Sequence, residues 1–209
     1  MRTPTKHLRA LRKALQQAEE IVQGVDKNLP AKTDLERLKI RSYVLLTHAA
    51  IEEYIETLAL DVAQESRRRF TKNGTITHTL IALISSKLID EVGTRSRQKI
   101  SSELICNINI FSTEAYNRFR NEIKENHGIK RHNQFKVFHP IGVDPEQEDS
   151  ALMSTLDSYG TQRGNVAHSY LGIDTEPSLS DAMTAVNVIQ RDIEVYDTAA
   201  VMCLRKRTR

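Results

Sequence analysis

Arg163 and His168 are the pair of residues in this sequence best suited to chemistry on a phosphodiester. A histidine with a pKa of about 6.5 can move a proton near neutral pH, and a positioned one typically accelerates a reaction about 10²- to 10⁴-fold. The guanidinium of arginine stays charged, and its planar fork binds two phosphate oxygens. The two side chains together could therefore cleave RNA without a metal ion, with arginine stabilising the charge that develops on the phosphate.

The spacing of Arg163 and His168 does not by itself select this pair. Arginine followed by histidine, with four to six residues between them, occurs at four places, namely Arg2/His7, Arg41/His48, Arg120/His127 and Arg163/His168. With 18 Arg and 7 His in the chain, several such matches are expected by chance. The context selects the last pair, because Asn165 and the small Ala167 lie inside it and a predicted closing helix follows it.

Helices must position these residues, because apolar side chains recur at steps of three and four along most of the chain. Capping boxes at Thr33/Glu36 and Ser178/Asp181, and the Asp144-Pro145 start signal, mark three helix beginnings. The predicted helices lie over residues 5–25, from 33 past 62 (the longest), over 77–92, once or twice within 95–128, from 144 to about 170, and from 178 onwards. We expect residues 127–143 to form a loop, with a short extended stretch over Phe135 to Phe138.

The composition indicates a single domain over residues 1–209, an all-α helical bundle whose middle, residues 66–143, is an elaborated insertion. No apolar run reaches the roughly 18 residues that span a bilayer, and the basic N-terminus lacks the apolar stretch of a secretory signal. These features predict a cytoplasmic protein without a membrane contact. Cys106 and Cys203 lie in apolar surroundings, which predicts two buried thiols.

Several classes of enzyme lack their signature in this sequence. It contains no Gly-rich phosphate loop, no H-E-x-x-H, no G-x-S-x-G and no EF-hand loop. We therefore expect neither a metal site nor a cofactor. The absence of Trp and an aromatic content of 5% also argue against a stacking platform for single strands.

Two stretches resemble the HEPN superfamily of helical-bundle proteins, many of which are metal-independent RNases or toxins. Residues 163–168 are similar to its R-N-x-x-A-H motif, although Gly164 follows the arginine and the asparagine comes one place later. Residues 42–55 look like the early HEPN helix in which an acidic residue, here Glu52, precedes an aromatic one by two. The similarity is greatest to the RiboL-PSP and MAE-type branches.

The resemblance implies roles for individual residues. His168 would be the general acid/base and Arg163 the charge stabiliser, with Asn165 and Glu52 supporting them in a homodimer whose active site is composite. His168-Ser169-Tyr170 also resembles a toxin variant in which the tyrosine is modified, which makes Tyr170 a candidate regulatory site. A cognate antitoxin or activator protein is the partner that such a toxin implies.

For these residues a purely structural role remains an alternative. Arg163 could be a buried arginine bonded to Glu52 or Asp157, and His48, one turn before Glu52, is better explained as a core histidine. The basic residues between Arg118 and Lys136 could be a solvated face or could bind RNA phosphates. The candidate RNA contacts among them are Arg118, Arg120, Lys130 and Arg131.

The sequence therefore predicts a metal-independent endoribonuclease of the HEPN type, acting as a toxin or an antiviral defence effector. The alternative is a catalytically silent HEPN-like module that binds a nucleotide or a protein. A DNA-binding helical protein is a weaker reading, because no helix-turn-helix pair with a basic recognition face is present.

Overall fold

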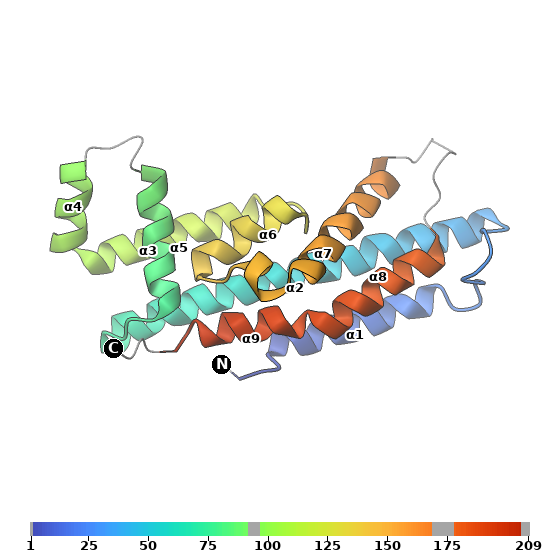
Figure 1. Ribbon diagram of the computed structural model, residues 1–209, viewed down its shortest axis with the longest axis horizontal. Helices are drawn as coiled ribbons and strands as arrows, with labels where there is room; N and C mark the ends of the chain where they lie inside the picture. The colour runs from blue at the N-terminus through green and yellow to red at the C-terminus, as the bar shows by residue number, and fades with distance from the viewer. Residues whose placement is uncertain (1, 92–96, 169–177, 206–209) are drawn as a thin grey trace.

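The computed structural model describes residues 2–91, 97–168 and 178–205, and within them it is helical without any strand. The helices run in chain order from α1 to α9, and the short 3-10 helix η1 separates α6 from α7 (Figure 1). Their bounds are α1 Lys6–Ile21, α2 Asp34–Asn73, α3 His78–Glu91, α4 Arg97–Cys106, α5 Ile108–Lys124, α6 Arg131–Phe138, η1 His139–Ile141, α7 Pro145–His168, α8 Leu179–Asp192 and α9 Glu194–Met202. An all-α bundle is confirmed.

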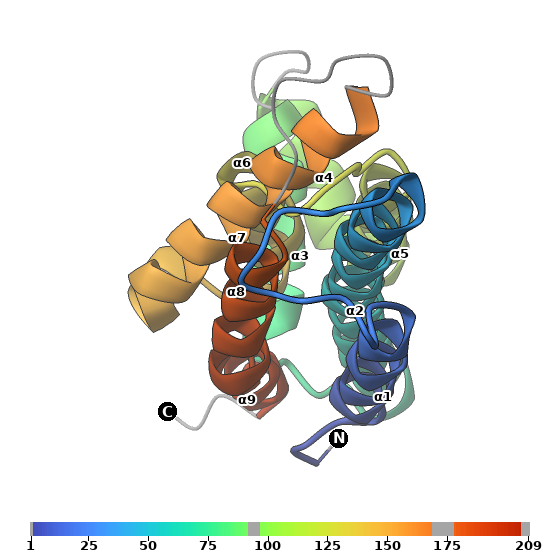
Figure 2. The ribbon, with the colours of Figure 1, turned by 90° about the vertical axis from the view of Figure 1, so that its right-hand side faces the viewer.

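Helix α2 is the central element, and at 40 residues it is the longest, as predicted. The Thr33 hydroxyl caps its first turn by accepting from the Glu36 N–H, and Gly74 ends it in the left-handed conformation at φ 65°. Helices α1, α8 and α9 run alongside α2, whereas α7 crosses it obliquely (Figures 1 and 2). Side chains along α2 are buried on more than one side, as a central helix requires.

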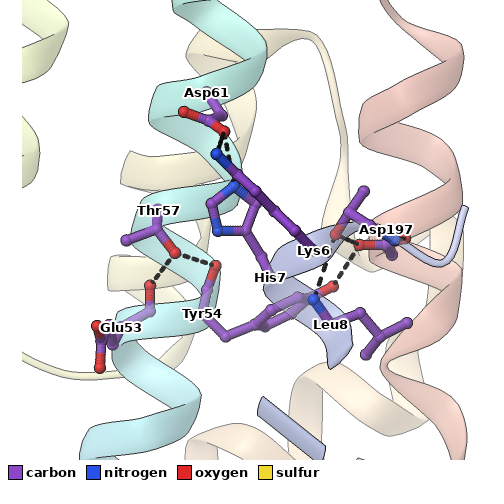
Figure 3. A network of polar contacts seen from close by, with 9 residues as sticks. Lys6, His7, Leu8, Glu53, Tyr54, Thr57, Asp61 and Asp197 are labelled. Atoms are coloured by element: carbon purple, nitrogen blue, oxygen red, sulfur yellow. Dashed lines mark hydrogen bonds and ion pairs between the residues drawn. The ribbon is translucent and has the colours of Figure 1, made fainter. Parts of the chain in front are cut away.

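The buried carboxylate of Asp197 on α9 ties the start of α1 to the bundle (Figure 3). It accepts from the Thr5 N–H at 2.9 Å and from the Thr5 hydroxyl at 2.5 Å, while the Tyr54 hydroxyl on α2 donates to it at 3.4 Å. Burial and the nearby Asp197 charge raise the pKa of Tyr54 well above its usual value. Three elements therefore meet at one buried carboxylate.

A second contact of α1 lies about two turns further along α2, at Asp61. Lys6 and His7 both reach the carboxylate of Asp61, each at 2.8 Å (Figure 3). Burial alone would raise the pKa of Asp61, but the hydrogen bonds from Lys6 and His7 outweigh it and lower that pKa. The first turn of α1 is thus fixed to both α2 and α9.

Three details of the sequence prediction are wrong. Residues 131–141 form α6 and η1 where a loop with an extended stretch was expected, because buried side chains such as Val137 and Phe138 supply the core contacts that stabilise a helix this short. Cys106, predicted to be buried, is exposed at the end of α4, and Cys203 is only half-buried. The closing helix is divided at Ile193 into α8 and α9.

Helix α7, which carries the Arg163–His168 pair, is interrupted at Asp149, whose backbone is extended (φ −161°, ψ 97°). The Asp149 carboxylate accepts from the N–H groups of Ala151 and Leu152 at 3.0 and 2.9 Å, as an N-cap does. The helix that leads to Arg163 is therefore a newly capped segment that begins just after Asp149.

Candidate active site

His48 and Glu52 lie on one face of α2, since residues four apart stack along an α-helix. The side chain of His48 is only 2% exposed, and its Nδ1 lies 3.6 Å from Glu52 Oε2. The interpretation of His48 as a core residue is thus confirmed by its burial. What the sequence did not reveal is which helix covers it.

Arg163 on α7 faces this part of α2. Burial and, as a smaller contribution, the positive charge of Arg163 together lower the pKa of His48 to about 4. A hydrogen bond of 2.5 Å between the Thr47 and Tyr159 hydroxyls holds α2 and α7 together one turn before Arg163. The site therefore combines an uncharged histidine and a carboxylate from α2 with a guanidinium from α7.

The segment between α5 and α6 closes the site on a third side. The Gly128 N–H donates to Glu52 Oε1, and the amide of Asn126 donates to Glu56 at 2.7 Å and accepts from Asn133 at 2.9 Å. Gly128 has a φ of 123°, a conformation that other residues adopt at a cost. Glu52 is consequently a positioning residue, whose carboxylate fixes this segment beside α2.

The contacts of this segment also place Lys130 beside α7. Arg131 N–H donates to Asp157 Oδ1 at 2.8 Å, and a Cβ added at Gly160 would lie 3.0 Å from Lys130 Cγ. Gly160 thus permits the close approach of the Lys130 side chain one turn before Arg163.

A purely structural role for Arg163 requires a bond to Glu52 or Asp157. Glu52 binds the Gly128 N–H and His48, and Asp157 binds the Arg131 N–H. Among the residues that the structure describes, no carboxylate forms an ion pair with half-buried Arg163. Within this part of the chain, neither Glu52 nor Asp157 is therefore the ion-pair partner of Arg163.

Two other predicted site residues, His168 and Tyr170, lie partly or wholly outside the described residues. His168 is the last residue of α7, and its side chain lies outside the described residues, as does all of Tyr170. Five residues of straight helix separate Arg163 from His168 by about 7.5 Å along the axis and about 140° around it. Asn165, two residues after Arg163 in α7, is exposed.

The four candidate RNA contacts are not gathered at one place. Arg118 on α5 binds Glu122 at 3.1 Å in a surface hollow that also contains Glu114 and Glu125, which disfavours phosphate there. Arg120 is exposed on the same helix. Arg131 forms an ion pair with Glu146 at 2.6 Å. The side chain of Lys130 lies close to Gly160, about one turn before Arg163.

Within residues 2–91, 97–168 and 178–205, no group of three or more His, Cys, Asp or Glu side chains is arranged to hold a metal ion. In the same part of the chain no helix is both long and apolar enough to cross a bilayer.

The buried, uncharged His48 should make folding stability depend on pH. Its folded pKa of about 4 lies below the unfolded value of about 6.5, so between these values the unfolded chain binds more protons. We expect the free energy of unfolding to fall by about 2 to 3 kcal/mol from this group as the pH drops from 7 to 4.5. Urea unfolding at the two pH values measures it. The His48→Gln variant should lose this share of the pH dependence and the exposed His132→Gln variant should keep it; equal slopes would contradict the assignment.

Gly164, between Arg163 and Asn165, is not required by packing, since a Cβ added there meets nothing within 4 Å. We expect Gly164→Ala to raise the free energy of unfolding by about 0.5 to 1 kcal/mol, because alanine loses less backbone entropy in a helix. Gly160→Ala is the matched control in the same helix and should destabilise, because Lys130 must move. Thermal unfolding of both variants decides the point, and a destabilised Gly164→Ala would show that this turn is not a regular helix.

A protein-family model described as RiboL-PSP-HEPN matches residues 9–201, which is nearly the whole chain. No curated protein matches the chain, and no solved structure does.

Proposed function

The chain belongs to the RiboL-PSP-HEPN family, and from this membership we propose that it is a metal-independent endoribonuclease. The HEPN families include RNases, and the Arg163–His168 motif lies within the matched range. The observation that carries the proposal is the half-buried Arg163, which faces His48 and forms no ion pair with a carboxylate among the described residues. An arginine kept available in this way suits the charge of a phosphate.

The proposed reaction is an internal transesterification of single-stranded or loop RNA. The ribose 2′-oxygen attacks the adjacent phosphorus, the bond from phosphorus to the 5′-oxygen breaks, and a 2′,3′-cyclic phosphate and a 5′-hydroxyl result. His168 moves the proton as general acid/base, and Arg163 binds the phosphate oxygens as negative charge accumulates. Asn165 and Glu52 support them, Glu52 through its contacts with Gly128 and His48. Since His48 has a pKa of about 4, it is a poor proton carrier at neutral pH.

A homodimer forms part of the proposal, because one straight helix presents Arg163 and His168 in different directions. Apolar residues cover the α2 face beside the one that carries His48 and Glu52. They span an arc of about 100°, at 100° per residue, and they are Leu35, Leu38, Leu45, Leu46 and Ala49, all exposed. A second copy packed there would bring two sites together across a two-fold axis.

The dimer face can be tested by adding charge to it. We expect the Leu38→Glu/Leu45→Glu variant to be monomeric in light scattering and to lose most RNA cleavage, since two carboxylates would have to be buried at the interface. Ile105→Glu is the control, because Ile105 is 78% exposed on α4, away from this face. A wild-type monomer at working concentration, or an active monomeric variant, would contradict the dimer.

The biological role that we propose is that of a cytoplasmic toxin or antiviral defence effector. A cognate antitoxin or activator protein would control it, and Tyr170 is the candidate position for an inhibiting modification. The expression test is direct: the wild-type chain should arrest growth, and Arg163→Ala and His168→Ala should not. If the folded wild type has no effect on growth and cuts no RNA, a silent nucleotide- or protein-binding module replaces the nuclease.

A further inference from the structure

A cavity of about 390 Å³ lies between the α1–α2 loop, the first turns of α2 and the start of α8. Figures 1 and 2 place this loop beside the N-terminal end of α8. We refer to this cavity as the α2–α8 cavity. Its lining combines apolar residues, three cations and small polar residues, namely Leu29, Pro30, Ala31, Ile40 and Leu179, then Lys27, Arg37 and Arg41, and then Asn28, Ser178 and Ser180.

The charged residues that line this cavity within the described part of the chain are all cations. They are Lys27, Arg37 and Arg41. Arg37 binds Asp34 at 3.1 Å, but the Asp34 side chain is 98% exposed and therefore lies in solvent. Arg37 is thus already engaged, and Lys27 and Arg41 are the other two cations of the lining.

The start of α8 adds to the positive electrostatic potential of the cavity. Its first turn is capped by Ser178, whose hydroxyl accepts from the Asp181 N–H, and Leu179 and Ser180 line the cavity. The N-terminus of a helix carries a partial positive charge. Beside it, the apolar floor formed by Ile40, Leu29 and Pro30 offers a surface for an uncharged ring.

The cavity shares a helix face with the candidate active site. Arg37, Arg41, His48 and Glu52 follow one another at steps of four, seven and four residues, which keeps them within about 60° around α2. Arg41 and His48 are about 10.5 Å apart along the axis. One bound strand could therefore contact both places.

We propose that the α2–α8 cavity binds one nucleotide unit of the RNA strand whose cleaved bond lies at Arg163, an assignment that rests on RNA being the substrate. The phosphate binds Arg41 and Lys27, with Arg37 at the rim, and the base lies against the apolar floor. The cavity thus holds the strand in register with the reacting phosphate.

The test is the affinity for a short 2′-O-methyl RNA strand, which lacks the attacking hydroxyl and so reports binding alone. We expect Lys27→Gln/Arg41→Gln to weaken binding on the order of tenfold in low salt and to reduce the salt slope by about 1.4, because two cations leave a single strand. The control Lys13→Gln/Lys72→Gln removes two exposed lysines elsewhere and should bind like the wild type. Circular dichroism checks that both variants are folded.

A second titration with 5′-AMP separates the two sources of phosphate. Loss of AMP binding in Lys27→Gln/Arg41→Gln, with strand binding unchanged, would overturn the strand assignment and make the cavity a site for free nucleotides. Wild-type affinity for both probes in that variant would overturn the cavity altogether, even if the protein cleaves RNA. Strand binding that depends on Lys27 and Arg41 in a protein that cleaves nothing would support the cavity and reject the nuclease.

Discussion

Arg163→Ala is expected to lower kcat/KM for RNA cleavage by about 10²- to 10³-fold, the cost of removing one group that stabilises charge in a transition state. The guanidinium forms no ion pair with a carboxylate among the described residues, so its loss should cost the fold little. Initial rates on a fluorescence-quenched RNA measure the first effect. Urea unfolding measures the second.

The conservative variant Arg163→Lys distinguishes binding of a phosphate from simple packing. Lysine keeps the charge and loses the planar fork, so we expect it to recover part of the lost rate. An Arg163→Ala enzyme that cleaves at the wild-type rate, or one that is inactive only because it is unfolded, would remove Arg163 from the reaction.

Asp197→Ala should have the largest effect on stability, a loss of about 3 kcal/mol in the free energy of unfolding. The substitution leaves the buried N–H and hydroxyl of Thr5 and the hydroxyl of Tyr54 without their shared acceptor (Figure 3). It also frees the start of α1 from α9. Urea denaturation followed by circular dichroism gives the value.

Asp192→Ala is the control for Asp197→Ala, because Asp192 binds the exposed Arg191 at the end of α8. We expect a change within about 0.5 kcal/mol, as for other surface pairs. Equal losses in the two variants would mean that the buried network around Asp197 does not stabilise the bundle.

The long, capped helices could be predicted from the sequence because their signals are local. Thr33 and Ser178 cap α2 and α8 as expected, and Gly74 ends α2. Helix α6 was missed because its stability comes from tertiary burial of Val137 and Phe138, which no local pattern reveals. The break in α7 depends on how Asp149 uses its carboxylate, which the periodicity also does not show.

Some features of the candidate site could likewise be predicted from the sequence, and others could not. Arg163 and Glu52 could be found from short motifs, but the contact of Glu52 with Gly128 joins residues 76 positions apart. The approach of Arg163 to His48 likewise depends on how α7 crosses α2. The i, i+4 spacing of His48 and Glu52 was the only local sign that this histidine lies beside the site.

Cleavage of total cellular RNA by the purified protein in EDTA, wild type against His168→Ala, tests the central proposal most directly. We predict that the wild type leaves 2′,3′-cyclic phosphate and 5′-hydroxyl ends and that His168→Ala, folded and dimeric, leaves the RNA intact. Cleavage that stops in EDTA, ends of another kind, or a His168→Ala protein as active as the wild type would contradict a metal-independent reaction with His168 as its general acid/base.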